Sequence, residues 1–478
     1  AGILTPKEML EGFSNKGMIT VALLFLVSEG IRQSGTLGQV IKKLLPQGKT
    51  TVFKAQLRIL PSVAFISAFL NNTPVVVIFA PIIKHWAKSV NLPATKFLIP
   101  LSYVTILGGI CTLIGTSTNL VVHGMILEAG FEGFSMFELG KVGIFIAIAG
   151  IIYIFLFSKR LLPDARPDTA VPDEEIEEGE KFHRVEAVLG ARFPGINKKL
   201  KDFNFQRHYG AEVKEIKTRN GQRFVTNLDD VVLHEGDTLV VMADDTFIPT
   251  WGESSVFVLL TNGNEPDTSG KKKRWFALLL LVLMIVGATV GELPVTKEMF
   301  PDIKLDMFFF VSITTIIMAW TNLFPARKYT KYISWDILIT IACAFAISKA
   351  MVNSGVADSV AKFIIGLSDD YGPHVLLAMV FIITNLFTEL ITNNAAAALA
   401  FPLALSISAQ LGVSPTPFFV VICMAASASF STPIGYQTNL IVQGIGNYKF
   451  TDFVRIGLPL NIITFLISVI LIPLIWNF

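Results

Sequence analysis

The stretch Leu70-Asn71-Asn72-Thr73-Pro74 interrupts a long apolar segment, and Gly115-Thr116-Ser117-Thr118-Asn119 interrupts the next one along the chain. The same order returns in the second half, where Thr392-Asn393-Asn394 is followed by Gly435-Tyr436-Gln437-Thr438-Asn439. The spacing is nearly constant, because the paired asparagines lie 394 − 72 = 322 and 439 − 119 = 320 residues apart. Two like halves, each with two polar breaks in its apolar segments, predict an inverted structural repeat.

Composition places the chain in a lipid bilayer. Of its 478 residues, 52% are hydrophobic and only 16% are charged, whereas an ordinary soluble domain carries about 25% charged residues. The formal net charge of +2 argues against a nucleic-acid partner. Apolar runs that approach the roughly 20 residues needed to cross the bilayer lie at 18–32, 142–157, 275–290, 307–323, 335–351 and 456–476.

The distribution of charge predicts how the interrupted segments are threaded. Acidic residues concentrate at one set of segment ends, and lysines and arginines cluster at the other, at 42–58, 84–96, 159–160, 271–274, 327–331 and 449–455. The positive-inside rule makes the basic side cytoplasmic. The acidic and the basic segment ends lie on opposite sides of the membrane only if the segment around Asn72 enters and leaves by the same face, and the segment around Asn394 does likewise. We therefore expect two re-entrant hairpins, the first open to the cytoplasm and the second to the exterior.

These patterns predict an all-α polytopic membrane protein with an inverted repeat, two re-entrant hairpins and discontinuous helices, plus a small α+β cytoplasmic domain. The first membrane repeat covers residues 1–162, an acidic linker 163–180, the cytoplasmic domain 181–262, and the second repeat 263–478. Two apolar runs of the second repeat would have counterparts ahead of residue 1. We therefore expect at least two further spans on the N-terminal side.

The cytoplasmic domain has strand-like segments at 182–189, 211–217, 231–233 and 238–242, with a hairpin turn at Asn220-Gly221. The string Leu233-His234-Glu235-Gly236-Asp237-Thr238-Leu239-Val240-Val241 resembles the signature of the TrkA-C (RCK-C) domain of potassium-transport regulators. The resemblance implies either a structural cap at a dimer interface or a sensor of a small regulatory ligand.

The polar breaks carry amides and hydroxyls whose chemistry suits two kinds of ligand. A helix that ends in mid-membrane must have its free backbone groups satisfied by protein, water or ligand. Helix N-termini attract anions, and the groups expected to bind an anionic substrate are those of Asn72, Thr73, Thr118, Asn393, Asn394, Thr432 and Thr438. Oxygen atoms at the same breaks suit a hard cation such as Na⁺, and its expected ligands are Asn71, Asn72, Gly115, Thr116, Asn119, Thr392, Asn394, Gly435 and Asn439.

One carboxylate, Glu389, lies within the second hairpin, and its counterpart by spacing is Ser67. An intramembrane carboxylate is a functional candidate by default. Two interpretations stay open: Glu389 couples transport to a cation or a proton, or it is a buried structural partner.

The chain resembles the divalent anion:Na⁺ symporter (DASS) family, solute carrier family 13, over nearly all of both hydrophobic halves. Family members carry Ser-Asn-Thr at each hairpin tip, whereas these tips read Asn71-Asn72-Thr73 and Thr392-Asn393-Asn394. The resemblance implies Na⁺ as the co-transported ion, substrate and Na⁺ contacts at both tips, a homodimer, and an elevator movement of the hairpin-bearing part. The combination with a TrkA-C-like insert is similar to permeases that include sulfate carriers.

We therefore expect Na⁺-coupled symport of a small divalent anion, most simply sulfate, across the plasma (inner) membrane, without an organic cofactor. The alternatives are a C4-dicarboxylate:Na⁺ symporter and, with Glu389 as the proton carrier, a Na⁺/H⁺ antiporter or metalloid efflux carrier. A channel gated by the cytoplasmic domain is disfavoured by the opposed hairpins. An enzyme is disfavoured because the sequence shows no nucleophile–base pair or metal-ligand cluster.

Overall fold

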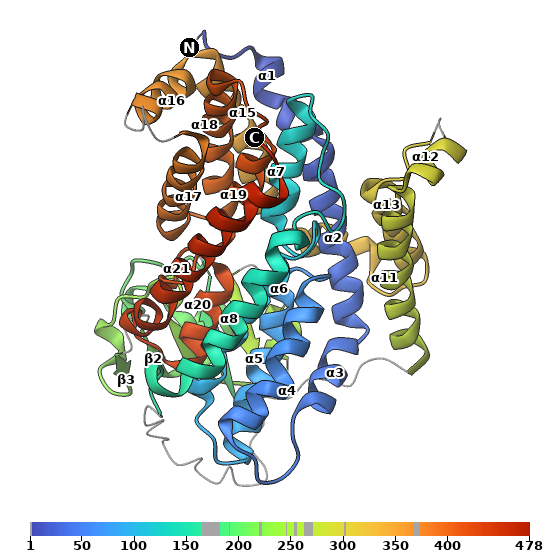
Figure 1. Cartoon of the computed structure of the whole chain (residues 1–478). Coiled ribbons are helices and arrows are strands. Elements are labelled where there is room, and N and C mark those ends of the chain that lie inside the picture. Colours follow the sequence, from blue (N-terminus) through green and yellow to red (C-terminus); the bar gives the residue numbers. More distant parts are fainter. Residues whose placement is uncertain are drawn as a thin grey trace.

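The computed structural model describes residues 2–164, 182–190, 192–218, 222–244, 246–252, 256–261, 271–300, 303–366 and 372–478. A large helical body is joined at one end by a small five-stranded sheet (Figure 1). Six helices of the described part are long and apolar enough to cross a membrane, or seven if the bent pair Ala326–Tyr332 and Ile337–Asn353 counts as one span. The chain is thus a polytopic α-helical membrane protein with a small α+β insert, as the sequence predicts.

The first half of the helical body contains two breaks, one in a hairpin and one in a helix. The hairpin is formed by α4 and α5, which residues 68–71 join, and the broken helix by α6 and α7, which residues 110–116 join. The helices of this half are α1 (Pro6–Leu10), α2 (Lys16–Gln33), α3 (Thr36–Leu44), α4 (Val52–Ser67), α5 (Asn72–Ser89), α6 (Leu98–Gly109), α7 (Ser117–Glu128) and α8 (Gly140–Leu161).

The second half repeats this arrangement. Residues 391–392 join the hairpin arms α17 and α18, which pack against each other, and residues 428–436 join the broken helix α19 and α20. Its helices are α11 (Lys271–Gly291), α12 (Pro294–Met299), α13 (Met307–Trp320), α14 (Tyr329–Tyr332), α15 (Trp335–Asn353), α16 (Val356–Gly366), α17 (Gly372–Leu390), α18 (Asn393–Leu411), α19 (Thr416–Ser427), α20 (Gln437–Gly446) and α21 (Phe450–Ile475).

The two hairpins occupy opposite ends of the helical body. In Figure 1, α4 and α5 lie at the end that carries the sheet, and α17 and α18 lie at the other end. The broken helices α6/α7 and α19/α20 run between these ends, so all four breaks fall near the middle. The two hairpins at opposite ends and the two discontinuous helices are the arrangement that the predicted inverted repeat requires.

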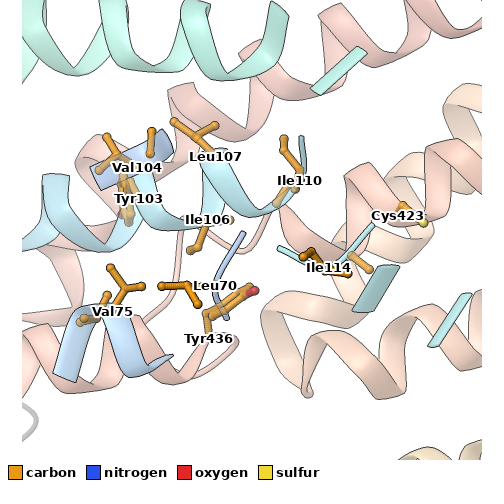
Figure 2. Packing of buried hydrophobic residues seen from close by; sticks show 14 of the residues in the cluster. Leu70, Val75, Tyr103, Val104, Ile106, Leu107, Ile110, Ile114, Cys423 and Tyr436 are labelled. Atoms are coloured by element: carbon orange, nitrogen blue, oxygen red, sulfur yellow. The ribbon is translucent and has the colours of Figure 1, made fainter. Parts of the chain in front are cut away.

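Helices near the breaks approach one another closely, and glycines make this possible. A β-carbon at Gly108 of α6 would lie 2.1 Å from the Ala64 carbonyl oxygen of α4. A β-carbon at Gly457 of α21 would lie 2.0 Å from the carbonyl oxygen of Phe430. Apolar side chains fill the space around these crossings, and Figure 2 shows Leu70, Ile106 and Tyr436 within that packing.

The insert is an antiparallel sheet with the strand order β3-β2-β4-β1-β5. The expected segment at 231–233 is not a strand, because only Val232 forms an isolated bridge, to Lys199. The last strand was not predicted, and the expected turn at Asn220-Gly221 lies outside the described residues. The strands are β1 (Phe182–Leu189), β2 (Glu212–Lys217), β3 (Arg223–Phe224), β4 (Thr238–Asp244) and β5 (Phe257–Thr261), with short helices α9 (Phe205–Tyr209) and α10 (Phe247–Trp251).

We predict that Gly108→Ala lowers the thermal unfolding temperature of the purified protein. The added methyl group meets backbone of α4, which cannot move aside as a side chain can, and such overpacking costs about 1–3 kcal/mol. Gly366→Ala is the matched control, because no atom lies within 4 Å of its β-carbon position. Equal unfolding temperatures for the two variants would contradict the close α4–α6 crossing.

Candidate functional site

Four helix N-termini meet where the breaks converge, and they do so in two pairs. In the first pair, α5 starts at the tip of the first hairpin and α20 starts after the loop 428–436. The Asn72 side-chain amide donates to the Tyr436 hydroxyl at 2.7 Å, and Thr73 donates to the Gln437 side-chain oxygen at 3.2 Å. These bonds join residues 364 positions apart in the chain.

The second pair is the counterpart in the other half. Here α18 starts at the tip of the second hairpin, where the Thr392 hydroxyl caps the backbone N–H of Ala395 at 3.4 Å. Asn393 donates to the Thr118 hydroxyl of α7 at 2.7 Å. Ser117 and Thr118 in turn donate to the Asn394 side-chain oxygen at 3.2 and 3.1 Å. The first turn of each hairpin's second arm therefore contacts the first turn of a broken helix.

The hydroxyl of Tyr436 links the two pairs. Besides Asn72 of the first pair, it bonds at 3.0 Å to the hydroxyl of Thr116, which precedes α7 in the second pair. Tyr436 is only 6% exposed, so these partners take the place of water. Sequence reasoning missed this residue and Gln437, although the 320-residue offset places them opposite Thr116 and Ser117 and so marks them as the points where the repeats differ.

Asn119 and Asn439 hold the two unwound loops in shape. The Asn119 amide group donates to the Thr112 and Gly109 carbonyls at 2.9 and 3.4 Å. The Asn439 amide group does the same for the Thr432 and Ser429 carbonyls, at 3.1 and 2.8 Å. The donor lies seven and ten residues after its acceptors in both halves, so each amide group fastens the loop that precedes its own helix.

The oxygen atoms of these two amides have different surroundings. The Asn439 side-chain oxygen accepts a hydrogen bond from Ser102 at 2.7 Å, and the Ser102 hydroxyl also lies 2.8 Å from the Thr438 hydroxyl. The Asn119 side-chain oxygen is buried and has no hydrogen-bond partner among the described residues. A buried acceptor without a donor is costly, and a cation would satisfy it.

Gly115 and Gly435 let the loops lie directly on the hairpins. A β-carbon at Gly115 would lie 2.9 Å from the carbonyl oxygen of Ala68, and one at Gly435 would lie 2.3 Å from that of Thr388. Their backbone N–H groups are capped by hydroxyls earlier in the loop, and Thr432 is the acceptor for Gly435 at 3.3 Å. These glycines therefore shape the candidate site through backbone packing.

Glu389 lies at the end of α17, against the second loop. One carboxylate oxygen accepts the Ser431 backbone N–H at 2.9 Å and the Asn461 side-chain amide at 2.7 Å. The other oxygen lies 3.4 Å from the Ser429 hydroxyl, and the Glu389 carbonyl accepts from Thr432 at 3.1 Å. The Glu389 side chain thus lies against the loop that connects α19 to α20.

Burial divides the expected site residues into two groups. A ligand could reach the partly exposed side chains of Asn71, Thr73, Asn393 and Thr432, together with the exposed Thr392 and Gln437. The remaining expected residues are buried and contact the loops or one another. They are Asn72, Gly115, Thr116, Thr118, Asn119, Asn394, Gly435, Thr438 and Asn439.

The electrostatics of this arrangement come from backbone rather than from basic side chains. None of the hydrogen bonds described above involves a lysine or an arginine. The N-termini of α5, α7, α18 and α20 carry partial positive charge, and the C-termini of α4, α6, α17 and α19 carry partial negative charge. A centre with both kinds of helix end can hold an anion and a cation near each other.

Comparison with known proteins gives a family and relatives. The model of the family described as CitMHS, citrate transporter, matches residues 1–407 and again 303–478. An uncharacterized transporter of Synechocystis is 30% identical over 100% of this chain and 91% of its own length. In Chlamydomonas reinhardtii, a putative sulfur deprivation response regulator is 28% identical over 98% of this chain and 94% of its own length. A probable sodium/sulfate cotransporter of the same alga is 23% identical over 96% of this chain and 82% of its own length.

We predict that Tyr436→Phe destabilises the protein by about 1–3 kcal/mol, because the buried donor of Asn72 loses its acceptor. Thermal unfolding of the purified variant measures this loss. Tyr329→Phe is the matched control, since Tyr329 is 49% exposed. If both variants unfolded at the wild-type temperature, the role of Tyr436 as the link between the two pairs would be wrong.

Proposed function

We propose that this protein carries sulfate together with Na⁺. The chain belongs to the citrate transporter (CitMHS) family and to the wider family of divalent anion:Na⁺ symporters, so it is a transporter and not an enzyme. The observation that carries this proposal is the convergence of four helix N-termini on a polar centre whose hydrogen bonds involve no lysine or arginine. The names of the relatives direct the choice of sulfate, since the full-length matches include a probable sodium/sulfate cotransporter.

The anion would bind at the N-terminal ends of α5, α18 and α20. Free N–H groups at helix starts and the partial positive charge there bind sulfate and phosphate in many proteins. Thr73, Asn393 and Gln437 line the accessible side of these ends, and their hydroxyl and amide donors suit oxygen atoms in a tetrahedral arrangement. Each helix N-terminus contributes roughly half a positive charge, so co-bound cations would complete the neutralisation of a divalent anion.

The cations would bind at the two unwound loops. In the first half, the unpartnered Asn119 oxygen offers an acceptor beside the loop 110–116. In the second half, the matching oxygen is already bonded to Ser102, but Glu389 brings a full negative charge to the loop 428–436. Oxygen ligands of this kind suit Na⁺. Cations held on both sides of the anion would offset the cost of removing its water.

Two alternatives fit this centre less well. A C4-dicarboxylate would also bind helix N-termini, and the chain belongs to the citrate transporter family. However, the relative that matches over 96% of the chain and is named for a substrate is a probable sodium/sulfate cotransporter. A Na⁺/H⁺ antiporter would need Glu389 free to exchange a proton, whereas its carboxylate is held by Ser431 and Asn461.

We also propose how the parts of the molecule divide the work. The hairpins and broken helices would move together across the membrane as an elevator, while α2, α11 and α13, which pack on one another, would form the static part of a homodimer. In Figure 1, α11 to α13 stand apart from the hairpins, which supports this division. The insert would lie on the cytoplasmic side of the plasma membrane, because the basic ends of the membrane segments gather on the side of the molecule that carries the insert.

We predict that proteoliposomes containing the protein take up radiolabelled sulfate only when Na⁺ is present outside. Thr73→Val should lower the uptake efficiency about tenfold or more, because a hydrogen bond to a charged ligand contributes about 1.5–3 kcal/mol. Thr321→Val on the α13 C-terminus is the matched control, since among the described residues its hydroxyl bonds only to its own helix.

Succinate and citrate serve as competitors in the same assay. Sulfate uptake at full rate after replacement of Na⁺ by choline would contradict Na⁺ coupling. Saturable uptake of succinate, with sulfate unable to compete, would transfer the assignment to a dicarboxylate.

A further inference from the structure

The insert contacts two helices of the candidate site directly, and one contact is an ion cluster. Glu186 of β1 accepts two bonds from the side-chain nitrogen of Lys84 on α5, at 2.8 and 2.9 Å. Lys217 of β2 donates to the same carboxylate at 3.3 Å. The side chains of Glu186 and Lys84 are 16% and 23% exposed, so this pair is shielded from water.

The charge state of this cluster is fixed at neutral pH. Burial alone would raise the pKa of the Glu186 carboxyl, but Lys84 and then Lys217 outweigh that effect and hold the pKa at about 2. The carboxylate is therefore ionised under all physiological conditions. Without Lys84, Glu186 would keep its bond to Lys217 inside the insert, but α5 would lose its ion pair with the insert.

The second contact lies on α20. The loop Gly236-Asp237-Thr238 packs on Leu440 and Gly444. A β-carbon at Gly444 would lie 2.6 Å from the Thr238 hydroxyl and 3.3 Å from the Gly236 carbonyl, and one at Gly236 would lie 2.6 Å from Leu440. The absence of β-carbons at these two glycines is what lets the loop reach the helix.

The two contacted helices both begin at the candidate site and come from opposite repeats. At 1.5 Å per residue, Lys84 lies about 18 Å along α5 from Asn72, and Gly444 lies about 9 Å along α20 from Thr438. Val188 and Leu259 of the insert join the hydrophobic cluster of the membrane helices, while most of the insert has a core of its own. The insert thus spans α5 and α20 at the ends remote from the bond between Asn72 and Tyr436.

We infer that the insert is a clamp that sets the position of α5 relative to α20, and that Glu186 is a positioning residue for the site through Lys84. Helices are stiff, so a change in their spacing at the insert alters the spacing of Thr73 and Gln437 at the other end. The inference rests on the proposed function for its transport readout. Its structural readout is independent of the substrate.

The transport test compares variants at the ion pair in the full chain. Lys84→Met and Glu186→Gln should each raise the Na⁺ and sulfate concentrations for half-maximal uptake about fivefold to tenfold, the lower end of a typical coupling between sites. The double variant should be no worse than either single one, and Lys84→Arg should retain the wild-type values. Lys54→Met, at an exposed position of α4, is the control for loss of a basic residue.

The structural test combines Glu186→Gln with Tyr436→Phe and measures thermal unfolding. Substitutions that far apart normally add, whereas a clamp predicts that the double variant unfolds at nearly the same temperature as the worse single variant. Gly444→Ala attacks the second contact and should behave like Glu186→Gln in both tests.

The outcomes separate the clamp from the transport proposal. Wild-type protein that takes up no sulfate with Na⁺ would overturn the proposed function, and the unfolding cycle would then decide on the clamp alone. Additive losses in that cycle, with half-maximal concentrations equal to those of Lys54→Met, would overturn the clamp.

Discussion

The structure depends on one constraint: a helix that stops inside a membrane leaves backbone groups that lipid cannot satisfy. Each such group costs several kcal/mol, and in this protein helices end at four places near the middle of the helical body. Side chains meet much of the cost. Asn385 and Thr388 of α17 donate to the Ala428 and Ala426 carbonyls at the end of α19, both at 2.6 Å, and Asn119 and Asn439 fasten the loops. We propose that the helix starts, in contrast, bind the anion.

Much of the architecture could be predicted because the repeat is visible in the sequence. Short polar stretches within apolar segments located all four breaks, and the separation of basic from acidic segment ends predicted the opposed hairpins. Tyr436 and Ser102 were not predicted, because their bonds join residues more than 300 positions apart and the register between the two halves cannot be derived from one sequence. In the insert, Val231 to Leu233 have strand-like composition, but Val232 pairs only with Lys199. No strand forms there, because a strand needs a neighbouring strand to pair with, and the sequence alone does not show which segments lie side by side.

The two halves are alike in backbone and unlike in chemistry. Thr116 corresponds to Tyr436, and Ser67, which donates to the Asn72 side-chain oxygen at 2.7 Å, corresponds to Glu389. The first half keeps an unpartnered amide oxygen, whereas the second half carries a carboxylate. Two cation sites built this way would differ in charge and so in their dependence on the bound anion.

A cryo-electron microscopy map of the full chain in lipid nanodiscs, with Na⁺ and sulfate present, would show whether the anion binds where the helix starts meet. We expect tetrahedral density at the starts of α5, α18 and α20, close to Thr73 and Gln437, and smaller densities at the loops 110–116 and 428–436. Density for sulfate elsewhere in the molecule, or helices that continue unbroken through Asn72 and Asn394, would contradict this expectation.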